Sequence, residues 1–420
     1  MSVESIHELL AGELILEHLQ SDETHLKGPV AILVEQMTRD AAADDRWQES
    51  PIFSSYAACR SHVTPQPIPQ PIGADGNGPM AMERGRCWRM GIVKAADVTD
   101  TVLEAAVVPS FSRIGPVLRS RLDHWTSTDT YRLDGRVIVI TGATSGLGLV
   151  ATRAWLAAGA TVDIVARNPQ KAAATVDRLR DEIQGASVRA TIAETADLDG
   201  LRTAAATLRA RHDRIDVLVH NAGALDQTHT YAATGIEQTV ASQVVGPFLL
   251  SALLYEPLTA AAPGRILWVS SGGMYTEPLS VDRLAIGPDD YRGSVAYARA
   301  KRAQVTLTEM MAERVDRSAL VVHAMHPGWA LTPGVERSLP TFRRVMAPLL
   351  RTAEQGADTL VWLAADDDQP LAATGRFWLD RRVRSLHKSK ATRVADTPAE
   401  RTRLWEWVTA AAGTDFPPQG

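Results

Sequence analysis

The chain is poor in cysteine, has no strong charge imbalance and carries acidic residues near its N-terminus. Its two cysteines in 420 residues, Cys59 and Cys87, are too few for a disulfide framework, so a reducing cytoplasm is the expected compartment. The net charge of -5, with acidic and basic residues mixed, gives no reason to expect nucleic-acid binding. Glu4, Glu8 and Glu13 stand where a signal peptide would need a basic start and an apolar core. Secretion is therefore not expected.

Long uninterrupted apolar runs are also missing. The longest uncharged window covers residues 238–255, which is near the length that crosses a membrane. Polar side chains interrupt it, including Thr239, Ser242 and Ser251. A buried amphipathic helix is therefore expected there instead of a membrane span.

The regular patterns begin only after the first 90 residues. Residues 1–90 contain a Pro/Gln run at 65–71 followed by three glycines, which predicts a poorly structured extension. Residues 91–130 carry a helix-like apolar stripe from Val102 to Leu122 with arginines elsewhere, so an amphipathic lead-in is expected. Such a helix packs on the main domain or lies on a membrane, and this 102–122 helix is the one membrane contact considered. Residues 386–420 are expected to form a C-terminal helical tail.

A glycine turn marks a strand-turn-helix unit. The strand-like run Val137 to Ile140 enters the turn 141–148, whose glycines fall at 142, 146 and 148, and an amphipathic run leaves it. In that context the backbone N–H groups at a helix N-terminus bind a pyrophosphate. The alternative is a glycine turn without a ligand, and the spacing differs from G-x-G-x-x-G.

Strand-like and helix-like segments alternate beyond this turn. Short apolar runs at 161–166, 217–219, 266–269 and 320–325 are separated by longer helical patterns. This alternation is typical of right-handed βαβ units and predicts an α/β fold, a doubly wound parallel sheet of the Rossmann type. Ligands then bind beyond the carboxyl ends of the strands.

Tyr297 and Lys301 are spaced to lie on one face of a helix. An ammonium beside a phenol favours the phenolate, which suits the tyrosine to donate or accept a proton. The pattern alone is weak, because a solvated helix pair has the same spacing.

Taken together, the motifs resemble those of the short-chain dehydrogenase/reductase family. The glycine turn, Asn221-Ala222-Gly223, Ser270-Ser271, Tyr297 with Lys301, and Pro327-Gly328 occur in the family's order. The resemblance covers about residues 133–380 and implies one catalytic domain at 131–385. Within the family, stretches such as Ser271-Gly272-Gly273-Met274 look most like the branch called dehydrogenase/reductase SDR family member 12.

The resemblance implies a nicotinamide cofactor and its binding residues. Arg167 follows the second strand where an NAD-preferring relative would carry an acidic residue, so NADP(H) is favoured over NAD(H). By resemblance, Asp197 and Leu198 would contact the adenine, and Thr332 the carboxamide. The cofactor-binding residues expected in this way are Gly142, Thr144, Ser145, Gly146, Leu147, Gly148, Arg167, Asp197, Leu198, Asn221, Ala222, Gly223, Tyr297, Lys301, Pro327, Gly328 and Thr332.

The resemblance also implies the catalytic residues. Hydride addition to a carbonyl carbon leaves negative charge on oxygen, so Tyr297 would supply the proton and Ser271 would stabilise the same oxygen. Lys301 would lower the pKa of the phenol and hold the ribose hydroxyls. Gln243 stands where many relatives have an asparagine that holds a water beside the lysine, and its extra methylene changes that geometry. No metal ion is expected.

Two functions of different classes follow from these patterns. The first is an NADP(H)-dependent oxidoreductase acting on a small-molecule carbonyl or secondary alcohol. The alternative is a non-catalytic dinucleotide-binding protein with a structural or sensing role, motivated by Gln243 and the long N-terminal extension. The sequence names no substrate and leaves a homo-oligomer open.

Overall fold

The computed structural model describes residues 96–331, 344 and 346–418. The chain divides into two compact units, one formed by Met1–Ser110 with Val117–His124 and the other by Phe111–Pro116 with Trp125–Gly420. We call the second the sheet unit. The prediction for residues 1–90 lies outside the described residues.

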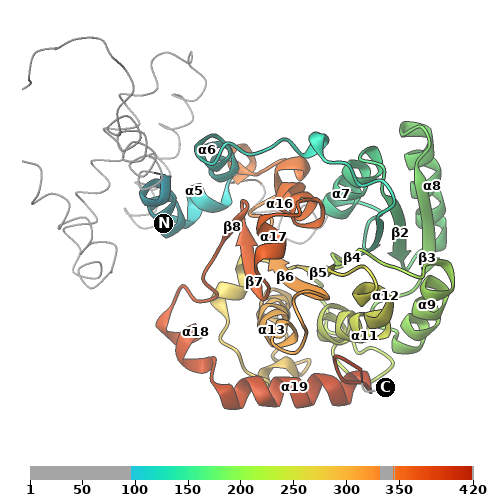
Figure 1. The fold of residues 1–420 in the computed structure, drawn as a ribbon. Helices are drawn as coiled ribbons and strands as arrows, with labels where there is room; N and C mark the ends of the chain where they lie inside the picture. Colours follow the sequence, from blue (N-terminus) through green and yellow to red (C-terminus); the bar gives the residue numbers. More distant parts are fainter. Residues whose placement is uncertain (1–95, 332–343, 345, 419–420) are drawn as a thin grey trace, which may run out of the picture. The chain divides into compact units, whose positions relative to one another are not determined.

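An eight-stranded sheet forms the centre of the sheet unit (Figure 1). Its order is β3-β2-β1-β4-β5-β6-β7-β8, with every neighbouring pair parallel except β7 and β8. The strands are β1 (Val137–Thr141), β2 (Thr161–Ala166), β3 (Ser187–Ile192), β4 (Val217–His220), β5 (Gly264–Val269), β6 (Leu320–Met325), β7 (Arg376–Leu379) and β8 (Arg382–Val383). The predicted doubly wound parallel sheet is confirmed.

Three strands carry no clear signal in the sequence. In β3 only Val188 and Thr191 are buried, because the strand lies at the sheet edge and exposes Arg189. The short strands β7 and β8 form the opposite edge. By contrast, the apolar runs predicted from the sequence belong to β1, β2, β4, β5 and β6. Each of these strands is buried and lies between two neighbouring strands of the sheet. Edge strands need no continuous apolar run, so hydrophobicity alone does not mark them.

Two layers of helices cover the sheet (Figure 1). The helices α7, α8 and α16 share one hydrophobic cluster with it, while α9, α11, α13 and α19 share another. The helices are α5 (Val107–Phe111), α6 (Ile114–Leu122), α7 (Gly146–Ala157), α8 (Pro169–Glu182), α9 (Leu198–Arg211), α10 (Gln238–Val240), α11 (Gly246–Leu253), α12 (Tyr255–Thr259), α13 (Gly293–Ala312), α16 (Ala353–Ala365), α17 (Gln369–Ala372), α18 (Lys390–Ala395) and α19 (Pro398–Ala412).

The described part of the first unit is helical and holds a buried arginine. Arg119 is fully buried, and its Nε lies 2.6 Å from the Asp100 carboxylate. It also donates to the carbonyl of Ser110 over 3.3 Å. The arginine therefore supports the packing of this unit instead of lying on an outer basic face. The helical stripe expected over 102–122 is interrupted, because α5 ends at Phe111 and α6 begins at Ile114.

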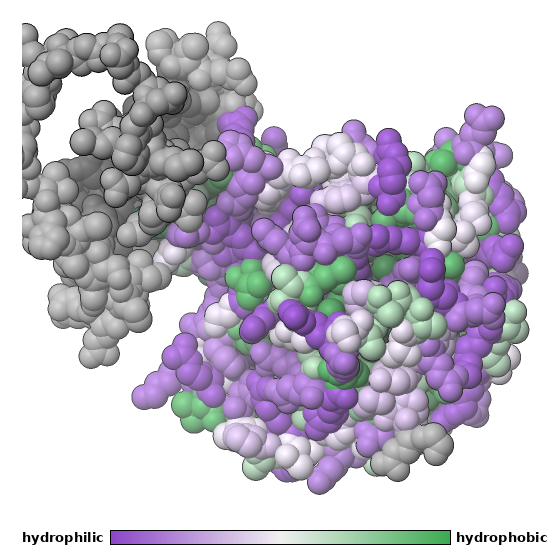
Figure 2. Space-filling view, viewed as in Figure 1, coloured by the Kyte–Doolittle hydropathy of each residue, from purple (hydrophilic) through white to green (hydrophobic). Residues whose placement is uncertain are grey.

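The uncharged window at 238–255 is buried and mostly helical. A π-helical turn, Ala241–Val245, joins α10 to α11, and all but one residue of that turn are buried. Among the described residues, no helix is both long and apolar enough to cross a membrane. In the space-filling view, hydrophobic residues lie scattered among hydrophilic ones on the visible face (Figure 2).

Candidate functional site

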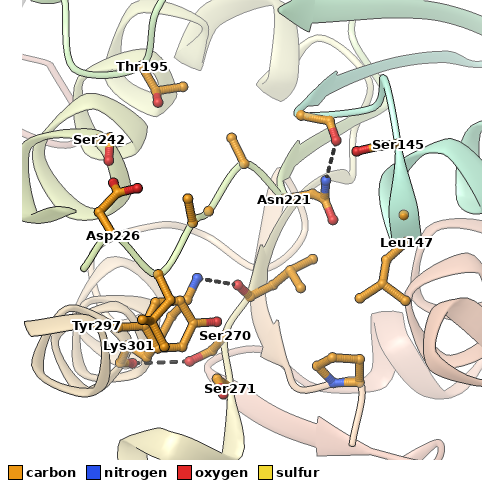
Figure 3. Close-up of a pocket in the computed structure, with 18 of the residues that line it drawn as sticks. Ser145, Leu147, Thr195, Asn221, Asp226, Ser242, Ser270, Ser271, Tyr297 and Lys301 are labelled. Carbon is orange, nitrogen blue, oxygen red and sulfur yellow. Dashed lines mark hydrogen bonds between the residues drawn. The ribbon is translucent and has the colours of Figure 1, made fainter. Parts of the chain in front are cut away.

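A cavity of about 1150 Å³ opens beyond the carboxyl ends of the parallel strands. Its walls come from the loops after strands β1 to β6 and from the start of α13, and Figure 3 shows part of this lining. Most of the residues expected at the site line it: Gly142, Thr144, Ser145, Gly146, Leu147, Arg167, Asn221, Ala222, Gly223, Ser271, Tyr297, Lys301, Pro327 and Gly328. The tertiary structure thus brings together segments that are far apart in the sequence.

The turn after β1 is held against the end of β4. Gly142 has a φ of 72°, and a Cβ there would lie 2.7 Å from the Ala222 Cα, so the close approach requires glycine. The Asn221 side-chain amide donates to the carbonyls of Thr141 and Gly142 over 3.1 and 2.9 Å. Asn221 therefore fixes the shape of the turn through its side chain while it lines the cavity.

The first turn of α7 opens onto the cavity. Ser145 is the N-cap residue, but its side chain makes no capping hydrogen bond. The N–H groups of a first helical turn have no partner within the helix, and here Gly146 and Leu147 line the cavity. These N–H groups and the helix dipole favour a phosphate.

Gly148 has a packing role and does not line the cavity. A Cβ at this position would lie 2.7 Å from the Gly142 carbonyl oxygen and still closer to the Asn221 amide. Glycine at 148 therefore lets α7 approach the turn.

Cations lie at the end of the cavity beyond β2. The Arg167 side chain is 72 % exposed, and its Nη1 lies 3.8 Å from the Glu194 carboxylate, which is a loose ion pair. Lys171 lines the same region from α8. The Asn168 side chain caps this helix by accepting from the Lys171 N–H over 2.8 Å. Lys171 was not among the residues expected at the site. Its position in the first helical turn after Arg167 and Asn168 was a sequence signal that could have indicated it.

The structure differs from the expectation for Asp197 and Leu198. Asp197 caps α9 by accepting from the Gly200 N–H over 3.0 Å, and Leu198 is buried in the hydrophobic core. Glu194 and Thr195 line the cavity instead. Because β3 ends at Ile192, the chain has already entered the helix at 197 and 198. The residues that line the cavity after β3 therefore come earlier in the chain than Asp197 and Leu198.

One helix positions the tyrosine and lysine of the site. Tyr297 and Lys301 lie one turn apart on α13, with Lys301 Nζ 5.2 Å from the centroid of the Tyr297 ring (Figure 3). Lys301 Nζ donates to the Val269 carbonyl over 2.9 Å. Ser270 Oγ donates to the Lys301 carbonyl over 3.1 Å, so this serine anchors the helix.

Ser271 faces the phenol directly. Its Oγ accepts from the Gly273 N–H over 3.2 Å and also hydrogen-bonds the Tyr297 side chain. Ser270 is committed to α13, so Ser271 is the serine that can contact a bound substrate oxygen. A hydroxyl and a phenol converging on one point suit the stabilisation and protonation of an oxyanion.

Burial determines the charge of both ionisable groups. It raises the pKa of Tyr297 above its usual value, against the opposing effect of the Ser271 hydrogen bond. Burial lowers the pKa of Lys301 to about 7, because the amine loses its hydration. The expected lowering of the phenol pKa by Lys301 is thus not found in the protein alone, since desolvation dominates at Tyr297.

Lys301 should make stability depend on pH. Its pKa is about 7 in the folded protein against 10.5 for the free group, so the unfolded chain binds an extra proton between these values. The free energy of unfolding should therefore rise as pH increases from about 7 to about 9.5. Lys301→Met should remove much of this rise, as measured by Tm across that range. Lys171→Met, at an exposed lysine, is the control, and a Lys301→Met protein with the parental slope would contradict the assignment.

Gln243 lies behind the cavity wall. Its Nε2 donates to the Ala224 carbonyl over 2.7 Å, and its backbone carbonyl accepts from Gln304 Nε2 over 2.7 Å. The Oε1 atom is buried without a hydrogen-bond partner. A Cβ on Gly223 would lie 3.1 Å from this oxygen and 3.3 Å from Lys301 Nζ. Gln243 is therefore close to the lysine but does not line the cavity itself.

The loop after β6 closes another side of the cavity. Pro327, Gly328, Trp329 and Ala330 line it, while Thr332 lies outside the described residues. Trp329 and Ala330 were not among the expected site residues. Within the described part of the chain, no group of three or more His, Cys, Asp and Glu side chains could hold a metal ion.

Comparison with known proteins finds one matching family model and several relatives. A family model described as short chain dehydrogenase matches residues 136–341. Dehydrogenase/reductase SDR family member 12 from Homo sapiens is 31% identical over 283 residues, covering 67% of this chain and 88% of the relative. Retinol dehydrogenase 12 from Homo sapiens is 28% identical over 280 residues, covering 65% and 88%. A solved structure of an uncharacterized protein from Mycobacterium paratuberculosis has a TM-score of 0.55 and 25% identity, covering 70% of this chain and 99% of that chain.

Proposed function

Because this chain belongs to the short-chain dehydrogenase/reductase family, we propose that it transfers a hydride between NADP(H) and a carbonyl or secondary alcohol. The observation that carries the proposal is the meeting of Ser271, Tyr297 and Lys301 on the wall of a cavity that also reaches Arg167. One cavity is therefore lined by a proton donor, Tyr297, a hydrogen-bond donor for an oxyanion, Ser271, and a cation for a phosphate, Arg167.

The residues of the cavity fit a phosphorylated dinucleotide. The uncapped start of α7 suits a pyrophosphate, because its N–H groups have no side-chain partner from Ser145. Arg167 and Lys171 suit a ribose 2′-phosphate at the end of β2, where a carboxylate for the 2′-hydroxyl would otherwise stand. Lys301, one turn from Tyr297 on α13, would hold the ribose of the nicotinamide. The bound cofactor supplies the hydride.

The protein's own groups manage charge and proton. In the reduction direction, negative charge develops on the substrate oxygen, and Ser271 Oγ donates a hydrogen bond to it. Tyr297 gives its proton to the same oxygen, and Lys301 lies one helical turn away, with its Nζ 5.2 Å from the centroid of the phenol ring. In the oxidation direction the same tyrosine removes the proton from the alcohol. The lowered pKa of Lys301 keeps its charged and neutral forms both accessible near neutral pH.

The substrate region is partly polar. Asp226, Ser242, Thr276 and Ser294 line the cavity on this side, and Trp329 adds an aromatic surface. Figure 3 shows Asp226 and Ser242 on the same side of the cavity as Tyr297. These groups suit a substrate with an apolar body and a few hydrogen-bonding substituents.

A cofactor-oxidation assay tests the proposal. NADPH consumption would be followed with aldehydes, ketones, quinones and retinal, the last because one relative is named a retinol dehydrogenase. We expect turnover of at least one carbonyl class, lost in the presence of excess NADP⁺. Tight NADPH binding without turnover of any compound would instead favour a non-catalytic dinucleotide-binding protein. The position of Gln243 behind the cavity wall would then support this alternative.

A further inference from the structure

The short segment Phe111–Pro116 belongs to the sheet unit although it precedes the first strand, β1. The matching family region begins at residue 136, so nothing in that match accounts for it. Phe111, Ser112 and Ile114 are all buried. A buried segment outside the sheet and its helices requires a specific partner.

The backbone of this segment is bound to the loop after β6. The Phe111 carbonyl accepts from the Trp329 N–H over 2.7 Å and from Arg351 Nε over 2.9 Å. Arg351 Nε also donates to the Ser112 carbonyl over 3.0 Å. Trp329 is a wall residue of the cavity, so the Phe111 carbonyl is one residue removed from the site.

Arg351 joins this segment to the rest of the loop. Its Nη1 donates to the Pro327 carbonyl over 3.2 Å, and its backbone N–H donates to the Trp329 carbonyl over 2.9 Å. The guanidinium is buried and pairs with the buried Asp380 carboxylate, with Nη1 2.6 Å from Oδ1. A buried, paired guanidinium with this many acceptors fixes the positions of the backbone segments around it.

The Phe111 ring separates two loops that line the cavity. It lies edge-on to the His326 ring at 4.6 Å and to the Trp329 ring at 5.8 Å, after β6. A Cβ at Gly272 would lie 2.5 Å from the same ring, and Gly272 follows Ser271 directly. One side chain therefore contacts both the loop that carries the serine and the loop after β6.

We propose that Phe111 is a positioning residue that holds the Ser271 loop and the Pro327–Ala330 loop at the correct separation for cofactor and substrate. The inference rests on the proposed function, because it assigns these loops to the reaction. It gives a role in the site to Phe111, which lies before residue 136, where the match to the family model begins. Phe111 touches neither reacting group and acts through the loops it separates.

The test compares two buried phenylalanines in the full-length protein. Phe111→Ala should raise the Kd for NADPH about tenfold and lower kcat about tenfold, because the two loops lose their common support. The control, Phe248→Ala, removes a fully buried ring on α11 that packs against Trp405. It should lower Tm to a similar extent but leave Kd and kcat within about twofold of the parent. Parental values for Phe111→Ala, or equal losses in the control, would overturn the proposal.

A conservative variant and a cofactor-free measurement keep the outcome clear. Phe111→Leu retains most of the volume and should recover most of the NADPH affinity, and it serves if Phe111→Ala fails to fold. Amide exchange of the peptide containing Trp329 is followed without cofactor and should speed up in Phe111→Ala but not in Phe248→Ala. Absence of turnover or NADPH binding in the parent would defeat only the proposed function. Equal exchange in the two variants would defeat the positioning role.

Discussion

Replacing Tyr297 with phenylalanine should lower kcat about a thousandfold while NADPH affinity stays near that of the parent. The half-buried ring lines the cavity wall, so its shape is retained when the hydroxyl is removed. Only the proton donor and its hydrogen bond to Ser271 are lost. Steady-state rates with the best carbonyl substrate and a direct NADPH titration measure the two quantities separately.

Tyr291→Phe is the matched control for this change. Tyr291 lies just before α13, and its hydroxyl donates to the Asp226 carbonyl over 3.1 Å, but it does not line the cavity. Its loss should cost some stability and change kcat by less than about fivefold. Turnover of Tyr297→Phe within about tenfold of the parent would refute its role as the proton donor.

Arg167→Asp should reverse the cofactor preference, changing the ratio of the NADPH and NADH dissociation constants about a hundredfold. The change removes a cation from the end of β2 and introduces a charge that repels a 2′-phosphate while it can accept from a 2′-hydroxyl. Arg167 is mostly exposed and its ion pair with Glu194 is loose, so stability should change little. Titration of both cofactors against the same protein gives the ratio.

Arg178→Asp makes the same charge change on α8, away from the cavity. It should leave the ratio of the two dissociation constants unchanged within about threefold, because an exposed charge outside the site is screened by solvent and salt. An unchanged ratio in Arg167→Asp would mean that another group, with Lys171 the first candidate, recognises the ribose.

Local patterns were enough to predict the inner strands of the sheet, and the family resemblance supplied most of the cavity-wall residues. The inner strands are mainly apolar, and the glycine turn stands between the first of them and an amphipathic helix. Since parallel strands present their carboxyl ends at one edge, the segments after β1, β4, β5 and β6 had to meet there. Motif spacing added the pairing of Tyr297 with Lys301, because helical geometry alone places them on one face.

Other features depend on packing that no local pattern carries. The shift from Asp197 to Glu194 depends on where β3 ends, and that strand lies at an edge with little hydrophobic signal. The pKa of Tyr297 is raised because burial of the phenol has the largest effect on it. The spacing alone had predicted that Lys301 would lower this pKa. Long-range contacts and desolvation act only once the chain is folded.

By itself, then, the sequence determined the fold class through its periodicity, and its motifs taken together identified the family and singled out Tyr297 as the expected proton donor. The tertiary structure added a physical reason for Ser271, which the resemblance had already favoured, since Ser270 is bound to the Lys301 carbonyl while Ser271 hydrogen-bonds the phenol. It also decided that Phe111 lies between two loops of the site. That residue is more than 150 positions from either loop, and only folding brings a buried ring and a distant backbone into contact.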